Sequence, residues 1–173
     1  GECDFLIVHP VLGYLAIEVK GGGISFDPAS RQWQSRDSQQ FRHNIKDPVE
    51  QARSAKFELL KKLKSSGRWS DRFIKIAHGV IFPDCAAPPG NLGADKPVRL
   101  FCCSREFTRG LRAWVGQRIY EGRTPANCKP LGQDGVAAFT HILAYPFQLH
   151  FTVSARMEDA AEQLGVLEPT QFH

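Results

Sequence analysis

Several features that would identify a class of protein are missing from this sequence of 173 residues. Its longest apolar runs are strand-sized, so it has neither a membrane span of about 20 residues nor the apolar core of a signal peptide. The five cysteines show no C-x-x-C spacing, which argues against a zinc knuckle and a secreted disulfide framework. A G-x-S-x-G nucleophile elbow and a P-loop are also missing. We therefore expect a soluble protein with a cytoplasmic location.

What the chain does contain is the composition of a globular domain. Hydrophobic residues make up 42% and charged residues 23% of the sequence, which fits one domain with at most a short appendage. The first residue is Gly1 rather than methionine. We therefore expect a processed or truncated chain whose upstream elements are missing.

Positive charge is concentrated in one stretch of the chain. The whole sequence has a formal net charge of +4, whereas residues 46–75 include nine basic and four acidic residues, a local excess of +5. A basic face of this kind can neutralise the phosphates of a nucleic acid. A solvated helix surface with lysine tails gives the same pattern, so charge alone leaves both interpretations open.

The apolar patterning predicts a layered α/β or α+β domain. Strands are expected where β-branched and aromatic residues cluster, at residues 3–9, 14–20, 24–27, 32–35, 73–82 and 98–102. The polar stretch 38–46 is predicted to be a loop. Because strands come first and helices then interleave with them, a sheet covered by helices is the expected architecture.

Helices are expected where capping residues precede an apolar stripe. Asp47 is a suitable N-cap, Pro48 occupies the first helical position, and Glu50 completes a capping-box-like pattern. A helix should therefore begin here and run to about residue 65. Further helices are predicted over residues 105–120, 134–144 and 154–164.

The residues that carry chemistry lie on the first predicted hairpin. Glu18 and Lys20 share one face of its second strand because side chains alternate along a strand. A three-residue loop 11–13 with a left-handed Gly13 would pair Asp4 with Lys20 and place Asp4 on the face of Glu18. A two-residue turn would place Asp4 on the opposite face. The glycine favours the first register.

These residue types suit the hydrolysis of a phosphodiester. Two carboxylates from adjacent strands, Asp4 and Glu18, together with the main-chain carbonyl of Val19, are hard oxygen ligands for Mg²⁺ or Mn²⁺. The neighbouring Lys20 can orient or help to deprotonate an attacking water. A Glu-x-Lys triplet also arises by chance in a chain of this length, so a solvated hairpin face stays open as the alternative.

Three stretches of the sequence resemble the NERD (nuclease-related) domain, a branch of the PD-(D/E)XK nuclease-like superfamily. They are Gly1-Glu2-Cys3-Asp4-Phe5-Leu6, Ile17-Glu18-Val19-Lys20-Gly21-Gly22 and Asp47-Pro48-Val49-Glu50-Gln51-Ala52. The resemblance covers about the first 65 residues. It implies a restriction-endonuclease-like α/β fold, with a central mixed sheet flanked by helices, whose usual N-terminal helix and strand we expect to be missing here.

The resemblance also implies roles for individual residues. Asp4 and Glu18 would be metal ligands, Lys20 the catalytic lysine, and Gln51 the glutamine that family members carry on the following helix. An ordinary glutamine bonded to backbone would equally explain Gln51. Glu2 shares a face with Asp4 by strand alternation, and is either a supporting acid behind the ligands or a solvated residue.

We therefore expect residues 1–153 to form a Mg²⁺-dependent nuclease domain that acts on DNA, with a helical extension over residues 154–173. The predicted basic helix would hold phosphates through Arg53, Lys56, Lys61, Lys62 and Lys64. The alternative is a catalytically silent module that positions nucleic acid for a partner domain. Residues 164–173 resemble the lead-in to a superfamily 1 helicase, which implies a covalently linked helicase domain downstream.

Overall fold

The computed structural model describes residues 3–37, 39–121 and 127–143 of the chain. The strands are β1 (Phe5–His9), β2 (Gly13–Val19), β3 (Gly23–Asp27), β4 (Gln32–Arg36), β5 (Arg42–Ile45), β6 (Ile76–Phe82) and β7 (Phe101–Cys103). The helices are α1 (Pro48–Ser65), α2 (Ser104–Arg109), α3 (Leu111–Tyr120) and α4 (Gly132–Leu143), with a 3₁₀ turn η1 at Val98–Leu100. The domain boundary predicted at residue 153, the helix 154–164 and the extension 154–173 lie outside the described residues.

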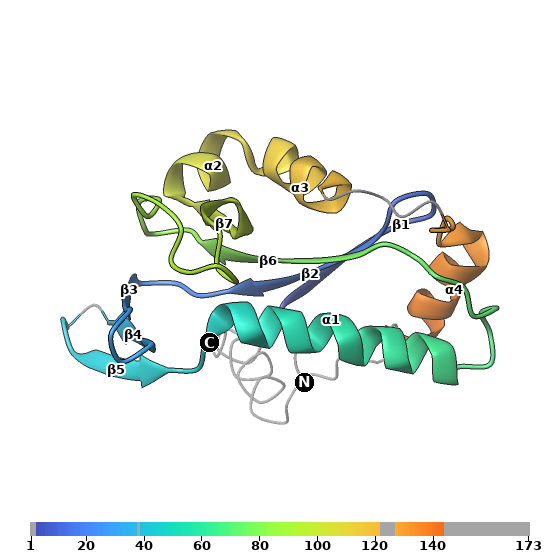
Figure 1. Ribbon diagram of the computed structural model, residues 1–173, viewed down its shortest axis with the longest axis horizontal. Coiled ribbons are helices and arrows are strands. Elements are labelled where there is room, and N and C mark those ends of the chain that lie inside the picture. Colours follow the sequence, from blue (N-terminus) through green and yellow to red (C-terminus); the bar gives the residue numbers. More distant parts are fainter. Residues whose placement is uncertain (1–2, 38, 122–126, 144–173) are drawn as a thin grey trace, which may run out of the picture. The chain divides into compact units, whose positions relative to one another are not determined.

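The central sheet is mixed, with the strand order β1-β2-β6-β7. β1 is antiparallel to β2, whereas β6 is parallel to β2 and β7 is parallel to β6. One face of β2 packs against α1, where Ala16 lies in a cluster with Leu63. The other face packs against α3, where Ile17 lies with Trp114 (Figure 1). A central mixed sheet between helices confirms the predicted fold class and is consistent with a restriction-endonuclease-like fold.

A second sheet, the meander, consists of the antiparallel strands β3, β4 and β5. Phe26, Trp33 and Ile45 pair directly across its strands and therefore share one face. The Trp33 ring, 2% exposed, lies 5.8 Å from that of Phe82 and 6.2 Å from that of Phe101. One aromatic side chain thereby joins the meander to the central sheet.

The prediction of a loop over residues 38–46 is wrong in its second half, where Arg42–Ile45 form β5. Asp37 organises the turn that precedes this strand. Its carboxylate accepts hydrogen bonds from the backbone N–H groups of Gln39 and Phe41 at 2.9 and 3.0 Å. β5 then pairs with β4 along its whole length. Strand formation here depends on backbone pairing with a neighbour, so a polar composition does not reveal it.

Two further predicted elements are divided in the structure. The strand expected over residues 98–102 is a 3₁₀ turn followed by β7. The helix expected over residues 105–120 is interrupted at Gly110, where a backbone φ of −142° separates α2 from α3. Glycine is a poor helix former, and this was the signal for the break in the sequence.

Helix α1 begins as predicted. Asp47 is its N-cap, and one carboxylate oxygen accepts hydrogen bonds from the backbone N–H groups of Val49 and Glu50 at 2.9 and 3.2 Å. The other oxygen lies 3.1 Å from Nζ of the buried Lys96, which comes from the loop after β6. Asp47 therefore connects the start of the helix to Lys96 of the loop after β6. Within the described ranges, no helix combines the length and the apolar character needed to cross a membrane.

Candidate active site

The register of the first hairpin differs from the predicted one by two residues. Phe5 of β1 pairs with Ile17 of β2. Extended by one residue, this register puts Asp4 opposite Glu18, whereas the predicted register put it opposite Lys20. The prediction of the register is therefore wrong. Because the shift is even, Asp4 and Glu18 still lie on the same face of the sheet, as expected.

Gly13 explains the difference in register. Its φ of +89° is left-handed, but the residue pairs with His9 as the first residue of β2 and does not belong to the loop. A Cβ atom at this position would overlap the carbonyl oxygen of Lys75, which accepts a hydrogen bond from the Tyr14 N–H. The turn is thus fixed by the chain that leads into β6. The turn residues alone could not predict this contact.

Glu18 is buried at the end of β2 and is 3% exposed. It faces α1 because it lies two residues after Ala16 and therefore shares its face. Nζ of Lys20 lies 2.6 Å from Oε1 of Glu18, and 29% of the Lys20 side chain is exposed. The backbone N–H of Lys20 donates to the carbonyl of Ile81 at 3.0 Å, so Lys20 continues along β6. The ion pair connects a buried carboxylate to the surface.

Asp4 reaches the same end of the sheet from the neighbouring strand. Its Oδ2 accepts a hydrogen bond from the backbone N–H of Val19 at 2.7 Å. The N–H and C=O groups of one strand residue point to the same side, so the Val19 carbonyl lies on the side of Asp4. The structure therefore brings together Asp4, Glu18, Val19 and Lys20.

Gln51 lies in the first turn of α1. Its Oε1 atom is buried and has no hydrogen-bond partner in the described part of the chain. Its neighbours on the helix, Val49 and Ala52, pack with Val80, and Val80 pairs directly with Glu18 between β6 and β2. The helix start is therefore level with Glu18. A buried amide oxygen without a partner is unfavourable unless a water, ion or ligand group binds it.

These atoms fit the donor chemistry of a divalent cation. One oxygen of Asp4 and one of Glu18 are hydrogen-bonded, and for residues 3–37, 39–121 and 127–143 the other oxygen of each has no partner. The Val19 carbonyl and Gln51 Oε1 are further hard oxygen atoms of the kind that Mg²⁺ prefers. Over the same ranges, no group of three or more His, Cys, Asp and Glu side chains could hold a metal. Glu2, the predicted supporting acid, lies outside the described residues.

The five basic residues predicted to bind phosphate do not form one face of α1. The helical period of 3.6 residues places Arg53, Lys56, Lys61 and Lys64 on one flank and Lys62 on the other. Lys61 and Lys62 are exposed, and neither has an ion-pair partner among the residues whose structure is described. These two lysines are the members of the set that are free to meet a ligand.

The remaining three are engaged by neighbouring side chains. Arg53 and Lys64 form exposed ion pairs of 2.9 and 3.1 Å with acidic residues. Nζ of Lys56 lies 3.1 Å from Nδ1 of His78. Burial lowers the pKa of Lys56, and the positive charge of Arg53 adds to this effect. These three side chains therefore already have partners within the described part of the chain.

A cavity of about 670 Å³ lies along the second half of α1. Its lining includes Phe57, Leu60 and Lys64 from the helix and Phe73 and Ile76 from the segment that enters β6. The acidic residues and the lysine of the hairpin do not line it. The candidate active site lies instead where α1 begins, level with the end of β2.

Two residues that sequence analysis did not single out support the site. Oδ2 of Asp84 accepts a hydrogen bond of 2.7 Å from the backbone N–H of Gly22 and so fixes the glycine turn that follows Lys20. Lys96 holds the N-cap of the helix that carries Gln51. Both come from the loop region after β6, distant in sequence from the residues that they support. No local pattern could have identified them.

An aspartate and a Glu-x-Lys triplet at one end of a mixed sheet, with a helix beginning beside them, are the arrangement expected of a PD-(D/E)XK nuclease-like domain. Residues 1–83 match the model of the family described as Nuclease-related domain, or NERD. The match reaches the end of β6 and confirms the resemblance inferred from the motifs, so this part of the chain is nuclease-related. No curated protein and no solved structure was found to match the chain.

Proposed function

We propose that the nuclease-related part of this chain is a metal-dependent nuclease that hydrolyses phosphodiester bonds in DNA. The observation that carries the proposal is the position of Glu18, a buried carboxylate 2.6 Å from Lys20 Nζ and opposite Asp4. Two carboxylates and one ammonium group leave a net charge of −1. Lys20 compensates the buried charge of Glu18, and the carboxylate of Asp4, which is exposed, leaves the site negative, so the site attracts an additional cation.

Mg²⁺ or Mn²⁺ suits this set of donors. Asp4, Glu18 and the Val19 carbonyl would hold the ion, with Gln51 Oε1 as a further oxygen. When bound, the ion would supply Lewis acidity at the phosphate and lower the pKa of the attacking water. The unpartnered oxygen of Gln51 supports this assignment, because a buried amide oxygen needs a partner of this kind.

Lys20 is the residue that we assign to the nucleophile. Its ammonium group has three donors, and the bond to Glu18 uses one of them. The other two can hold a water or a phosphate oxygen, because 29% of the side chain is exposed. Glu18 fixes the position of the amine, and a positioned amine can take part in proton transfer during the reaction.

DNA is the polyanion that we propose as the partner. The exposed Lys61 and Lys62 are free to neutralise phosphates, whereas Arg53, Lys56 and Lys64 would have to exchange an existing partner for one. A helicase domain downstream remains a proposal from residues 164–173, which lie outside the described residues. A P-loop soon after residue 173 in the reading frame would support it.

Cleavage of plasmid and single-stranded DNA in the presence of Mg²⁺ tests the catalytic proposal. Glu18→Gln and Lys20→Met should each lower the rate of cleavage by about 100-fold or more. The first removes a carboxylate that would bind the metal ion, and the second removes the amine that would act on the attacking water. Glu58→Gln and Lys129→Met are matched controls at exposed positions and should retain the wild-type rate. Unchanged Mg²⁺-dependent cleavage by both site variants would contradict the proposal. Circular dichroism checks that the variants are folded.

The metal assignment has a readout that does not depend on activity. A ligand that binds only the native state raises the melting temperature, so Mn²⁺ should stabilise the wild-type protein and stabilise Asp4→Asn less. Gln51→Leu should weaken the response as well. An equal response in the wild type and Asp4→Asn would reject the assignment. A protein that binds Mn²⁺ and DNA but does not cut DNA would be the catalytically silent alternative.

A further inference from the structure

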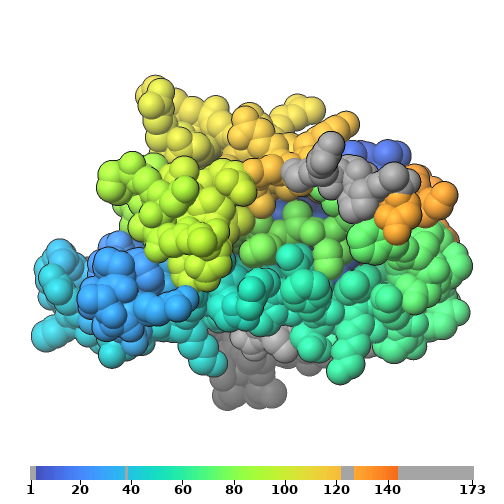
Figure 2. All heavy atoms as spheres, viewed as in Figure 1, coloured from blue at the N-terminus to red at the C-terminus, as the bar shows by residue number. Residues whose placement is uncertain are grey.

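The outer face of the meander carries polar groups that the candidate active site does not use. Residues that pair directly across antiparallel strands share a face. The register aligns two such rows, Gly23–Arg36–Arg42 and Ser25–Gln34–Asn44. The opposite face holds Trp33 and is packed against the central sheet. The two rows therefore face away from the core, and Figure 2 shows side chains of the meander (blue to light blue) at the surface beside the start of α1.

Arg36 and Arg42 stand directly opposite each other on β4 and β5. Like charges in this arrangement destabilise a sheet. Both side chains are exposed, and neither has an acidic ion-pair partner in the part of the chain that the structure describes. An arrangement that is unfavourable in the free protein is explained if the two guanidinium groups bind an anion.

Two amide side chains extend the basic row. Nε2 of Gln34 donates to Oδ1 of Asn44 at 3.1 Å, which leaves the Gln34 carbonyl and the Asn44 amide nitrogen for other partners. Guanidinium and amide groups on one surface are the donors that proteins use for phosphate oxygens and base edges. Asp27 lies on the same face two rows away from Arg36. The basic region is therefore confined to the arginine end of the sheet.

The position of this face relative to Lys20 follows from the chain. The segment from Lys20 to Gly23 spans at most about 11 Å, and each step between strands adds about 4.8 Å. The backbone of Arg36 is therefore within about 16 Å, and that of Arg42 within about 21 Å, of Lys20, less than one duplex turn of about 34 Å. At its other end the meander leads directly into α1 (Figure 1). The distance therefore allows a duplex held at Lys20 to reach both arginines.

We propose that four residues of the outer face bind the sugar-phosphate backbone of double-stranded nucleic acid beside the cleavage site: Arg36, Arg42, Gln34 and Asn44. This inference rests on the proposed nuclease function. A single strand fits this surface less well. Sheet surfaces that bind single strands present aromatic side chains on which bases stack, and the paired rows of the outer face contain none.

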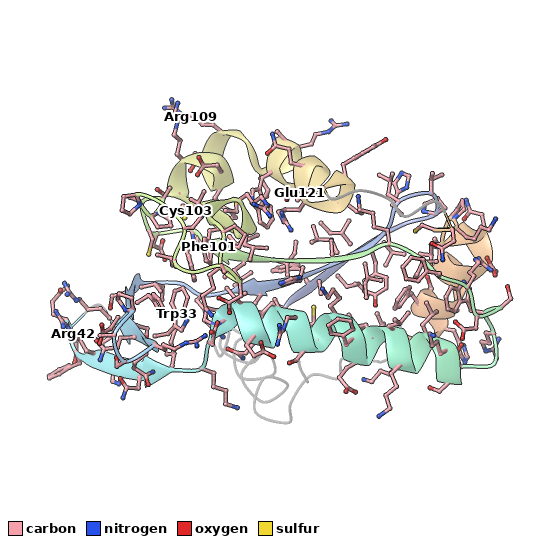
Figure 3. All side chains as sticks on the ribbon, viewed as in Figure 1. Trp33, Arg42, Phe101, Cys103, Arg109 and Glu121 are labelled. Carbon is pink, nitrogen blue, oxygen red and sulfur yellow. The ribbon has the colours of Figure 1, made fainter. Side chains whose placement is uncertain are left out.

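Duplex binding at several salt concentrations tests this inference. The probe is a fluorescent DNA duplex of about 24 base pairs, long enough for two helical turns, in buffer with EDTA. Arg36→Gln/Arg42→Gln should lower the slope of log K against log salt by about 2 and weaken binding at about 0.1 M salt by at least tenfold. The matched control, Arg105→Gln/Arg109→Gln, removes the same charge from exposed positions of α2 and should bind as the wild type does. Figure 3 shows Arg42 and Arg109 on different elements, well separated in the view.

An unchanged slope and affinity in the Arg36/Arg42 double variant would overturn the inference. An equal loss in the α2 control would also overturn it, because net charge alone would then explain the binding. So would equal affinity of the wild-type protein for the duplex and for one of its single strands. Duplex RNA of the same sequence distinguishes the two kinds of backbone, and a loss confined to the meander variant with either duplex supports the surface.

The design separates this inference from the proposed catalysis. EDTA removes Mg²⁺-dependent cleavage from the binding assay, so the result does not depend on whether Glu18 and Lys20 are catalytic. Loss of binding in the meander variant would support the surface even if cleavage proved independent of those two residues. The melting temperature of the variant should equal or exceed that of the wild type, because a repulsive pair is removed. A lower value together with lost binding would count against the surface.

Discussion

The two sheets of this chain distribute charge in opposite ways. In the central sheet, Glu18 follows the buried residues of β2 and forms a 2.6 Å ion pair with Lys20. In the meander, Arg36 and Arg42 place the same charge side by side on an exposed face. The first arrangement fixes a buried carboxylate beside a partly exposed amine, which is the preorganised geometry that a catalytic site needs. The second keeps positive charge available for a partner.

The contrast also appears in how each sheet is supported. β2 is covered on both faces, by α1 and by α3. The meander is covered on one face, and its packing onto the central sheet includes Trp33. A strand buried on both sides holds its side chains rigidly, whereas a sheet buried on one side leaves a surface for recognition. Changes that separate these two regions should therefore be measurable, and the expected effects follow from the largest to the smallest.

Trp33→Ala should have the largest effect, because it removes the ring that packs the meander onto the central sheet. Removal of a buried tryptophan lowers the free energy of unfolding by about 3–5 kcal/mol. Hydrogen exchange should accelerate in β3–β5, while the amides of β2 and β6 stay better protected. Phe41→Ala, at an aromatic residue that is 63% exposed in the same region, is the control and should change stability little. Equal acceleration of exchange in both sheets would show that they unfold together.

The stability of the central sheet should depend on pH because of His78, which lies on β6. Burial, followed by the positive charges of Lys56, Arg118 and Arg53, lowers the pKa of His78 from 6.5 to about 4. Between these values the unfolded chain binds more protons than the folded one, so stability should fall as pH decreases from about 6.5 to 4, by up to about 3 kcal/mol. Urea unfolding at pH 7.0, 5.5 and 4.5, chosen to span about this window, measures the effect.

The control for this titration is another histidine. His78→Gln should flatten the fall in stability over the window, because the neutral amide cannot be protonated in either state. His141→Gln, at an exposed position of α4, should keep the wild-type profile. A profile that is equally steep in His78→Gln would assign the pH dependence to other groups.

Lys96→Met tests the junction between the two sheets at the start of α1. The substitution removes a buried charge that lies 3.1 Å from Asp47, so unfolding free energy should fall by about 1–3 kcal/mol. The stabilisation by Mn²⁺ should weaken too, since the helix turn that carries Gln51 loses a support. Lys46→Met, an exposed lysine beside the same cap, serves as the control. Equal melting temperatures for the two variants would show that Lys96 does not support the helix.

Arg42→Gln should have the smallest effect, and its sign is opposite to the others. Removing one of two like charges in directly opposed positions should raise the free energy of unfolding by about 0.2–1 kcal/mol. Arg109→Gln on α2 should leave it nearly unchanged. Thermal melting at low salt measures the difference best, because salt screens exposed charges. A less stable Arg42→Gln variant would show that the two arginines do not repel each other in the free protein.

Local patterns in the sequence predict the parts of the site that depend on neighbouring residues. The shared face of Glu18 and Lys20 follows from strand alternation, and the start of α1 follows from Asp47 and Pro48. The placement of Asp4 on the same face is correct although the register is wrong. It survives because the error is an even number of residues.

The features that could not be predicted all depend on contacts between distant segments. The register follows from the approach of Gly13 to Lys75, and β5 follows from pairing with β4. Lys96 reaches Asp47 from a loop that is separated from it by α1 and β6. A periodicity measured along one segment contains no information about such a partner. The sequence therefore predicts which side chains share a strand face and where the helix begins. It does not predict the register of the hairpin or the distant residues that support the site.

The meander leaves the central fold three residues after Lys20 and returns to it just before Asp47. It is thus an excursion between the strand that ends in the candidate catalytic pair and the helix that carries Gln51. A segment with this connectivity can vary in length and sequence without interrupting β2 or α1, provided that the contact of Trp33 with the central sheet is kept. Grafting a different antiparallel sheet with a tryptophan at the position of Trp33 between Gly22 and Lys46 would therefore be a direct route to altered nucleic-acid preference with the hydrolytic residues left in place.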